Sequence, residues 1–270
     1  MTVTANIDTS YAAIGVTVPD ARHAAEFLAS LLGVDIVRRS AANTSVPIGP
    51  ASSVDFTTAN APDQLPPRLV DLGTNHLCLT VGDIEQAAAY LDSLDEVSIL
   101  GDIVTVPEGP IAGNKWVYFR SPWGALFELQ QWPDEPAYFR ETAARLSHSR
   151  EDVASALLPT CRGLDHTGYS VPDLDAAVAR LVHFHSATEV LRTEIAADRA
   201  FMTAQFDLDV EGTSRMAMVA VGDLNVELFQ HSVGSQEGPR SSAAVGGNHL
   251  TLPSAGSDLP DAVRLIPGSL

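Results

Sequence analysis

Histidine and glutamate recur at matched places in this sequence, and together they could bind a metal ion. His76, His166 and His249 each lie in a short apolar run typical of a β-strand. Glu128 and Glu227 each lie between large apolar residues. Successive side chains of a strand point to opposite faces, so these polar groups face inward, away from their apolar neighbours. A buried carboxylate needs a cation, a hydrogen-bond network or a proton, and a divalent metal would satisfy both residue types.

Ligands of these two types, supplied by separate strands, are typical of catalytic metal sites that leave a position open for water or substrate. We therefore predict a divalent metal cofactor, whether iron, manganese, zinc, nickel or cobalt. The spacing also recurs, because Asp55 precedes His76 by nearly the same number of residues as Glu227 precedes His249. This recurrence supports the prediction more strongly than any single residue does.

A unit of strand, turn and helix positions these residues and recurs along the chain. Each copy starts with an apolar strand, passes through a Pro-Asp or Gly-Asp turn and continues into an alanine-rich helix. The aspartate of the turn is placed to cap the helix, and β-prone runs ending in a strand with an acid follow. The copies contain Ala13, His76 and His166 near their starts and, more loosely, His249.

The repeats predict modules with one helix and about four strands, in the order βαβββ. Three modules would span roughly 10–60, 72–132 and 162–232, and a fourth would start near 246 and stop after a helix at 258–265.

This plan divides the chain into three parts. Residues 1–132 would hold an N-terminal pair of modules, the first of them degenerate. Residues 133–161 would form a helical linker, because they are helix-prone and bounded by prolines. Residues 162–270 would hold the third module and the partial fourth.

Three runs of the chain resemble the vicinal oxygen chelate superfamily, which includes glyoxalase I, methylmalonyl-CoA epimerase, extradiol dioxygenases and bleomycin-resistance proteins. They are His76–Ile84, Trp116–Leu129 and Gly163–Ala177, and the resemblance extends over nearly the whole chain. It implies an α+β fold in which βαβββ modules pair into cupped, incomplete barrels. The fourth module would be truncated.

The resemblance also implies metal ligands on the first and last strands of each module. The second module would supply His76 and Glu128, the third His166 and Glu227, and the fourth His249. The first module departs from the pattern, since Ala13 replaces its first ligand and Asp55 is a shorter acid.

Three pairings of modules therefore stay open. Modules one and two would offer Asp55 with the ligands of the second module. Modules three and four would offer His166, Glu227 and His249, the set we favour. A cross-pairing of modules two and three, within the chain or across a dimer, would offer two histidines and two glutamates.

We expect a divalent-metal-dependent isomerase, epimerase or lyase that acts on a small hydroxy-keto or acyl metabolite through a metal-stabilised enolate. Glu227, His231 and Tyr169 are the candidates to move or orient the proton. One alternative is a non-haem iron, ring-cleaving dioxygenase of the extradiol type.

A second alternative is a metal-free binding or resistance protein. Its cup would hold an aromatic ligand against Trp116, Tyr118 and Trp123.

Composition narrows the possible partners and location. The formal charge of −18 repels phosphate backbones and anionic lipids, so we expect a small-molecule substrate and neither nucleic acid nor membrane. The N-terminus lacks the features of a secretory signal, and Cys78 and Cys161 do not form a disulfide framework, so we expect a cytoplasmic protein. A truncated fourth module would leave an open sheet edge, which predicts a homodimer.

Overall fold

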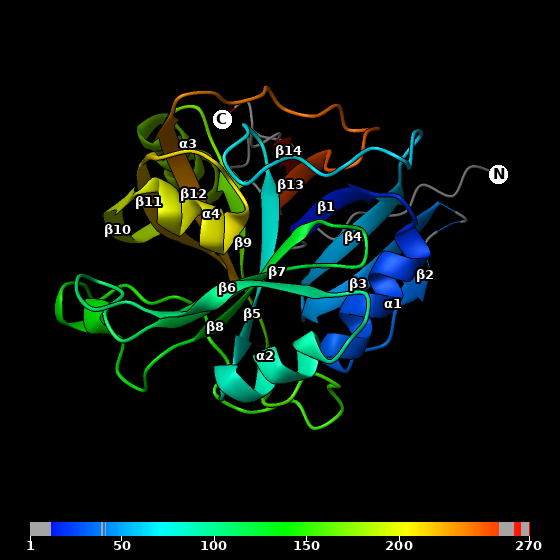
Figure 1. The fold of residues 1–270 in the computed structure, drawn as a ribbon, viewed down its shortest axis with the longest axis horizontal. Helices are drawn as coiled ribbons and strands as arrows, with labels where there is room; N and C mark the ends of the chain where they lie inside the picture. Colours follow the sequence, from blue (N-terminus) through cyan, green and yellow to red (C-terminus); the bar gives the residue numbers. More distant parts are fainter. Residues whose placement is uncertain (1–11, 39, 41, 254–261, 266–269) are drawn as a thin grey trace.

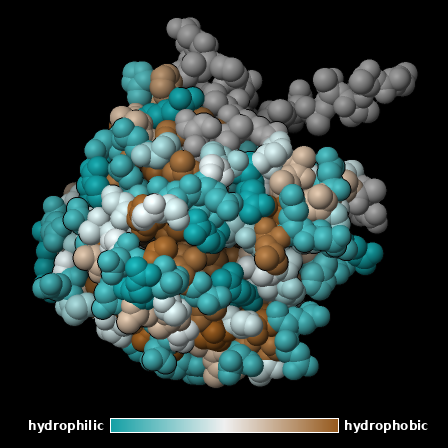
Figure 2. Space-filling model, turned by 45° about the horizontal axis from the view of Figure 1, so that its top comes forward, coloured by the Kyte–Doolittle hydropathy of each residue, from teal (hydrophilic) through white to brown (hydrophobic). Residues whose placement is uncertain are grey.

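The computed structural model describes residues 12–38, 40, 42–253, 262–265 and 270. These residues form two mixed β-sheets with helices packed on them (Figure 1). This arrangement confirms the predicted α+β fold of βαβββ modules in cupped sheets. Hydrophilic residues cover most of the face shown in Figure 2, and apolar residues gather near its centre. No helix in the described part of the chain is long and apolar enough to cross a bilayer.

The order of elements repeats from module to module. The first contains β1 (Ala12–Val18), α1 (Ala21–Leu32), β2 (Val37–Arg38), β3 (Asn43–Gly49) and β4 (Ser52–Thr58). The second contains β5 (Asn75–Val81), α2 (Ile84–Asp92), β6 (Ser98–Thr105), β7 (Lys115–Arg120) and β8 (Leu126–Gln131). The third contains β9 (Cys161–Ser170), α3 (Leu174–His185), β10 (Thr188–Ala197), α4 (Arg199–Phe206), β11 (Gly212–Val221) and β12 (Leu224–Val233). Strands β13 (Asn248–Pro253) and β14 (Ala262–Leu265) follow.

The turn aspartates start the module helices as predicted. The side chains of Asp20, Asp83 and Asp173 each accept a hydrogen bond from a backbone N–H in the first turn of α1, α2 and α3. Helix α1 ends at Gly33, whose φ of 67° is a left-handed conformation that glycine adopts without a steric penalty. The alanine and leucine faces of these helices then pack into the main core.

The strand order shows which modules pair. The larger sheet runs β10-β11-β12-β9-β5-β8-β7-β6, so modules two and three join through antiparallel β5 and β9 near the middle of Figure 1. The smaller sheet runs β14-β13-β1-β4-β3-β2, so module one joins the C-terminal strands. This is the cross-pairing within one chain, not the pairing of modules three and four that we favoured. All the first strands share one apolar alternation, which fixes the buried face of a strand but not its neighbour.

Two expected helices are absent from the described residues. The segment 133–160 contains only the short 3-10 helix η1 (Ala137–Arg140). The buried hydroxyl of Tyr138 accepts a hydrogen bond from the backbone N–H of Leu146 at 3.3 Å, and Leu146 is also buried. Both side chains pack in one apolar cluster with residues of β10 and β11, which holds the segment against the sheet.

The second difference lies in the partial fourth module. Residues 262–265 form strand β14, antiparallel to β13, where we expected the end of a helix. Hydrogen bonding to β13 extends the smaller sheet and overrides the local helical pattern. The rest of that expected helix, residues 258–261, lies outside the described residues. The expected homodimer stays a prediction.

Candidate metal centre

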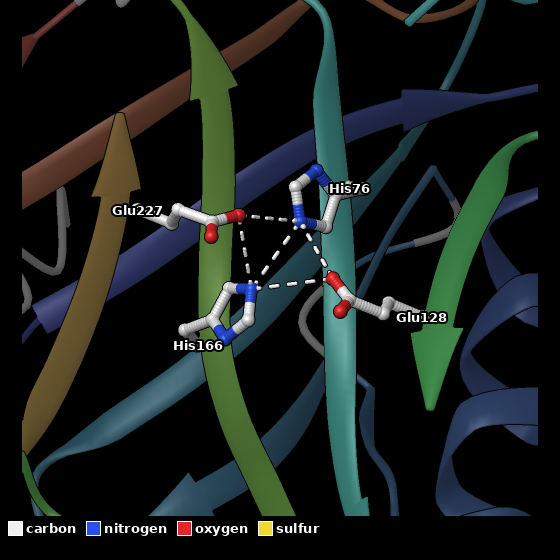
Figure 3. A group of neighbouring side chains, drawn as sticks. All are labelled: His76, Glu128, His166 and Glu227. Carbon is white, nitrogen blue, oxygen red and sulfur yellow. Dashed lines mark hydrogen bonds and ion pairs between the residues drawn. The ribbon is translucent and has the colours of Figure 1, made fainter. Parts of the chain in front are cut away.

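Four side chains from four strands converge in the larger sheet (Figure 3). The Nε2 atoms of His76 on β5 and His166 on β9 lie 3.3 Å apart. Atom Oε2 of Glu227, on β12, lies 3.2 Å from Nε2 of His76 and 3.3 Å from Nε2 of His166. Atom Oε2 of Glu128, on β8, lies 3.3 and 3.5 Å from the same two nitrogens. The structure therefore brings the polar groups of modules two and three to one centre.

Strand register explains this convergence. Gly168 of β9 pairs with His76 on one side and with Glu227 on the other, so the three residues share one face of the sheet. A Cβ atom at position 168 would lie 1.9 Å from Cε1 of His76, so only glycine leaves room for the imidazole ring. Cys78 of β5 has the corresponding place between the other two ligands.

All four side chains are buried, and their opposite charges counteract the effect of burial. Burial alone would lower the pKa of His76, but its close contacts with the negatively charged Glu128 and Glu227 raise it above its ordinary value. Burial alone would raise the pKa of Glu227, but His166 and His76 hold it well below the ordinary value. Two buried carboxylates can be balanced by two protonated imidazoles, or by one divalent cation bound to neutral imidazoles.

The four side chains suit a bound divalent cation with neutral imidazoles. Atom Oε2 of Glu227 is buried and has no hydrogen-bond partner among the described residues, although it faces both imidazoles. The four candidate ligand atoms all lie within 4.8 Å of one another. Two imidazole nitrogens and two carboxylate oxygens suit zinc, iron, manganese, cobalt or nickel.

A second layer of polar groups orients His166. Cys78 pairs with His166 while Leu79 pairs with Leu164, so Asp165 is the extra residue of a β-bulge. Such a bulge re-aims a side chain. Here it lets Asp165 reach Nδ1 of its neighbour His166, with 2.8 Å between Oδ1 and Nδ1.

The Asp165 carboxylate is itself anchored from the segment after β8. Its Oδ2 lies 2.9 Å from Nε1 of Trp132 and 3.0 Å from Nδ1 of His148. Burial alone would raise the pKa of Asp165, yet His148 and His166 hold it well below its usual value. An ionised carboxylate can only accept hydrogen bonds, so Nδ1 of His166 is the donor, and in the neutral imidazole its Nε2 keeps a lone pair for a metal.

A pocket opens from the centre, with an empty volume of about 780 Å³ that includes its open mouth. Glu128 and Glu227 lie in its wall with Gln130, Ser214 and His231. Its apolar lining includes Trp116, Tyr118, Phe201, Met202, Phe206 and Met216. Trp123, which we expected beside Trp116, instead packs edge-on against Phe27 and Phe127 in the main core.

His249 does not join the four-residue group. It lies on β13 in the smaller sheet and pairs with Gly15 of β1, much as His76 pairs with Gly168. Asp55 of β4 also pairs with Gly15. The smaller sheet thus repeats part of the arrangement. The favoured set of His166, Glu227 and His249 is divided between two sheets because β13 pairs with β1.

The two other proton-moving candidates lie in different surroundings. Tyr169 is buried in the main core, on the face opposite His166 and Gly168, because alternate residues of β9 face opposite sides. His231 lines the pocket, where Ser214 Oγ lies 2.7 Å from its Nδ1 and Ser170 Oγ lies 3.1 Å from its Nε2. Burial, together with the positive charge of His76, lowers the pKa of His231 to about 4.

Our sequence predictions missed two contributors to the site. The role of Asp165 had a sequence signal. Two polar residues in succession, Asp165 and His166, break the alternation of β9, and such a break can mark a β-bulge. Helix α4 could also have been predicted, since Asp198 precedes apolar residues at helical spacing. In the structure, the Asp198 side chain accepts a hydrogen bond from the N–H of Phe201 and caps the helix.

Comparisons with known proteins place this geometry in a family. The family model for the Glyoxalase/Bleomycin resistance protein/Dioxygenase superfamily matches residues 10–129. A protein of Actinomyces sp. named 2-epi-5-epi-valiolone epimerase is 32% identical over 155 residues, which cover 49% of this chain and 85% of that protein.

Solved structures agree at the level of the fold. Glyoxalase I from Zea mays has a TM-score of 0.53 at 15% identity, over 83% of this chain and 68% of that one. Its V278E mutant has a TM-score of 0.54 at 14% identity, over 95% and 91%. The sequence match to the Actinomyces protein extends the relationship beyond the fold. The chain therefore belongs to the glyoxalase, bleomycin resistance protein and dioxygenase superfamily.

Proposed function

We propose that this protein is a divalent-metal-dependent epimerase or isomerase that acts on a small hydroxy-keto or acyl metabolite. The observation that carries the proposal is the pair of carboxylates, Glu128 and Glu227, which approach the two imidazoles from opposite sides (Figure 3). Inverting a carbon centre requires a proton to leave one face and return to the other. Carboxylates on opposite sides suit that task. The similarity to a protein named as an epimerase supports the same reaction class.

The histidines and the carboxylates would have different roles. His76 and His166 would hold the metal, with His166 oriented by Asp165. A bound divalent ion would polarise the substrate carbonyl and stabilise the negative charge that develops when the neighbouring carbon loses its proton. Glu128 or Glu227 would accept that proton, and the other carboxylate would deliver one to the opposite face.

Two further side chains would position the substrate. Burial and the nearby carboxylates raise the pKa of Tyr118 well above its ordinary value, so its hydroxyl stays protonated and can donate a hydrogen bond. Tyr118 Oη lies 3.5 Å from Nε2 of His76.

His231 would act through Ser214. Ser170 donates its hydroxyl proton to Leu69 O at 2.6 Å, so it accepts from Nε2 of His231, whose Nδ1 then accepts from Ser214. Both ring nitrogens are engaged. We therefore assign His231 to orienting Ser214, not to moving the proton.

Exchange of substrate hydrogen with solvent deuterium tests the proposal. The metal-loaded protein should incorporate deuterium at the carbon beside the carbonyl of α-hydroxy ketones, without consuming dioxygen. Glu128→Gln and Glu227→Gln should each slow this exchange at least 100-fold, in the range of lost general acid–base catalysis. Asp175→Asn, which removes an exposed carboxylate on α3, should leave it unchanged. Consumption of dioxygen with ring cleavage of a catechol would instead support the dioxygenase alternative.

A further inference from the structure

We propose that the substrate of this site carries a hydrocarbon or aromatic group beside its hydroxy-keto or acyl function, and that helix α4 binds this group. The proposal rests on the proposed function and specifies its substrate class. It is based on the distribution of polar and apolar side chains in the pocket.

Most of the apolar lining lies on other elements than the two carboxylates, although Phe229 shares β12 with Glu227. The carboxylates Glu128 and Glu227 lie on β8 and β12, beside the central pair β5 and β9. The apolar wall comes largely from the outer strands β7 and β11 and from α4. A substrate whose reacting atoms lie at the centre must therefore place its remaining atoms against an apolar surface.

Helix α4 has no counterpart in the second module. It connects β10 to β11 in module three, whereas β6 and β7 of module two are joined without a helix. The helix contacts β6 and β7 across the cup. The ring of Phe206 stacks on Trp116, with centroids 6.1 Å apart and planes 14° apart, and meets Tyr118 edge-on at 5.0 Å. Phe201 meets Trp116 edge-on at 6.1 Å. The aromatic wall is thus built jointly by both modules.

This wall discriminates against a densely hydroxylated ligand. A hydroxyl group turned toward Phe201, Met202 and Phe206 of α4 would lose its hydrogen bonds to water and find no partner in these side chains. Each such unmatched group costs roughly tenfold in affinity. An aromatic ring of similar reach would instead bury apolar surface and gain affinity.

Asn114 is the polar exception in this part of the pocket. It is fully buried, and neither its side-chain nitrogen nor its oxygen has a hydrogen-bond partner among the described residues. The pocket thus leaves room for one hydrogen-bonding group on an otherwise apolar substituent.

Two α-hydroxy ketones test the proposal directly. One, 2-hydroxyacetophenone, carries a phenyl group, whereas erythrulose carries further hydroxyls. Affinities for the metal-loaded protein can be measured by calorimetry, independently of turnover. The phenyl ketone should bind at least tenfold more tightly.

Variants locate the source of that preference. Phe201→Ala should reduce the preference at least fivefold. Ile195→Ser, at an exposed position that lines the same pocket, should also reduce it, without removing a ring from the core. Phe184→Ala, at an exposed position on α3 outside the pocket, should leave it unchanged. Equal binding of the two ketones, no binding of the phenyl ketone, or a preference unchanged in both pocket variants would overturn the proposal. Preferential binding without deuterium exchange would instead remove the epimerase assignment alone.

Discussion

Replacing Asp165 by asparagine should weaken metal binding without removing any ligand. The carboxylate receives hydrogen bonds from Nδ1 of His166 at 2.8 Å and Nε1 of Trp132 at 2.9 Å, and Nδ1 of His148 lies 3.0 Å away. Asparagine has one acceptor oxygen in place of two, and its amide nitrogen can only donate. Either orientation of the amide therefore places a donor against a donor.

The size of the effect follows from these two orientations. If the amide oxygen faces His166, the half-buried Trp132 N–H loses its acceptor, which costs about 1 kcal/mol of folding free energy. If the amide nitrogen faces His166, Nδ1 must become the acceptor, and the proton moves to Nε2, the atom that would bind the metal. Loss of such a supporting contact typically weakens metal affinity 10–100-fold, or about 1.4–2.7 kcal/mol.

Competition with a chromophoric chelator measures this change. The zinc or cobalt dissociation constant of Asp165→Asn should rise by at least tenfold relative to the unchanged protein. Asp175→Asn makes the same chemical change at an exposed carboxylate that pairs with Arg192 and Arg215, and its dissociation constant should not change. An Asp165→Asn protein that is as stable to unfolding as the original and also binds metal as tightly would refute the role assigned to Asp165.

Two further predictions concern Gly168 and His231. Gly168→Ala should lower metal affinity at least tenfold, because its Cβ would lie 1.9 Å from Cε1 of His76. Gly15→Ala makes the same clash with His249 in the smaller sheet and should leave metal binding intact. Equal losses of affinity in both variants would contradict the placement of the metal beside Gly168. The pKa of His231 is about 4 when folded and about 6.5 when unfolded, so the unfolded state gains more protons as pH falls through this window. Between pH 7 and pH 5 this group should remove about 2 kcal/mol of stability, measured by urea unfolding, and His231→Gln should lack that portion of the loss.

Local patterns predicted the modules and the residues that converge. The alternation of apolar residues, the turn aspartates and the alanine-rich helical stripes are all readable over a few residues, so the βαβββ units follow from them. His76, Glu128, His166 and Glu227 were candidates because each is polar within an apolar strand.

Non-local pairing could not be predicted in the same way. β5 and β13 both begin with Asn-His-Leu, and β1 and β9 both carry a glycine where the partner's histidine lies across the sheet. Each first strand could therefore accept either partner, and the hydrogen-bonded neighbour depends on the packing of the whole chain. The same limit hid the role of Asp165, since a bulge is defined by the opposite strand as well as its own.

The number and location of bound metal ions test the central claim most directly. Elemental analysis after reconstitution and dialysis should find one divalent ion per chain in the unchanged protein and in His249→Ala. It should find none in His76→Ala or His166→Ala, although the two histidines come from different modules. An ion retained in His76→Ala and lost in His249→Ala would contradict the account.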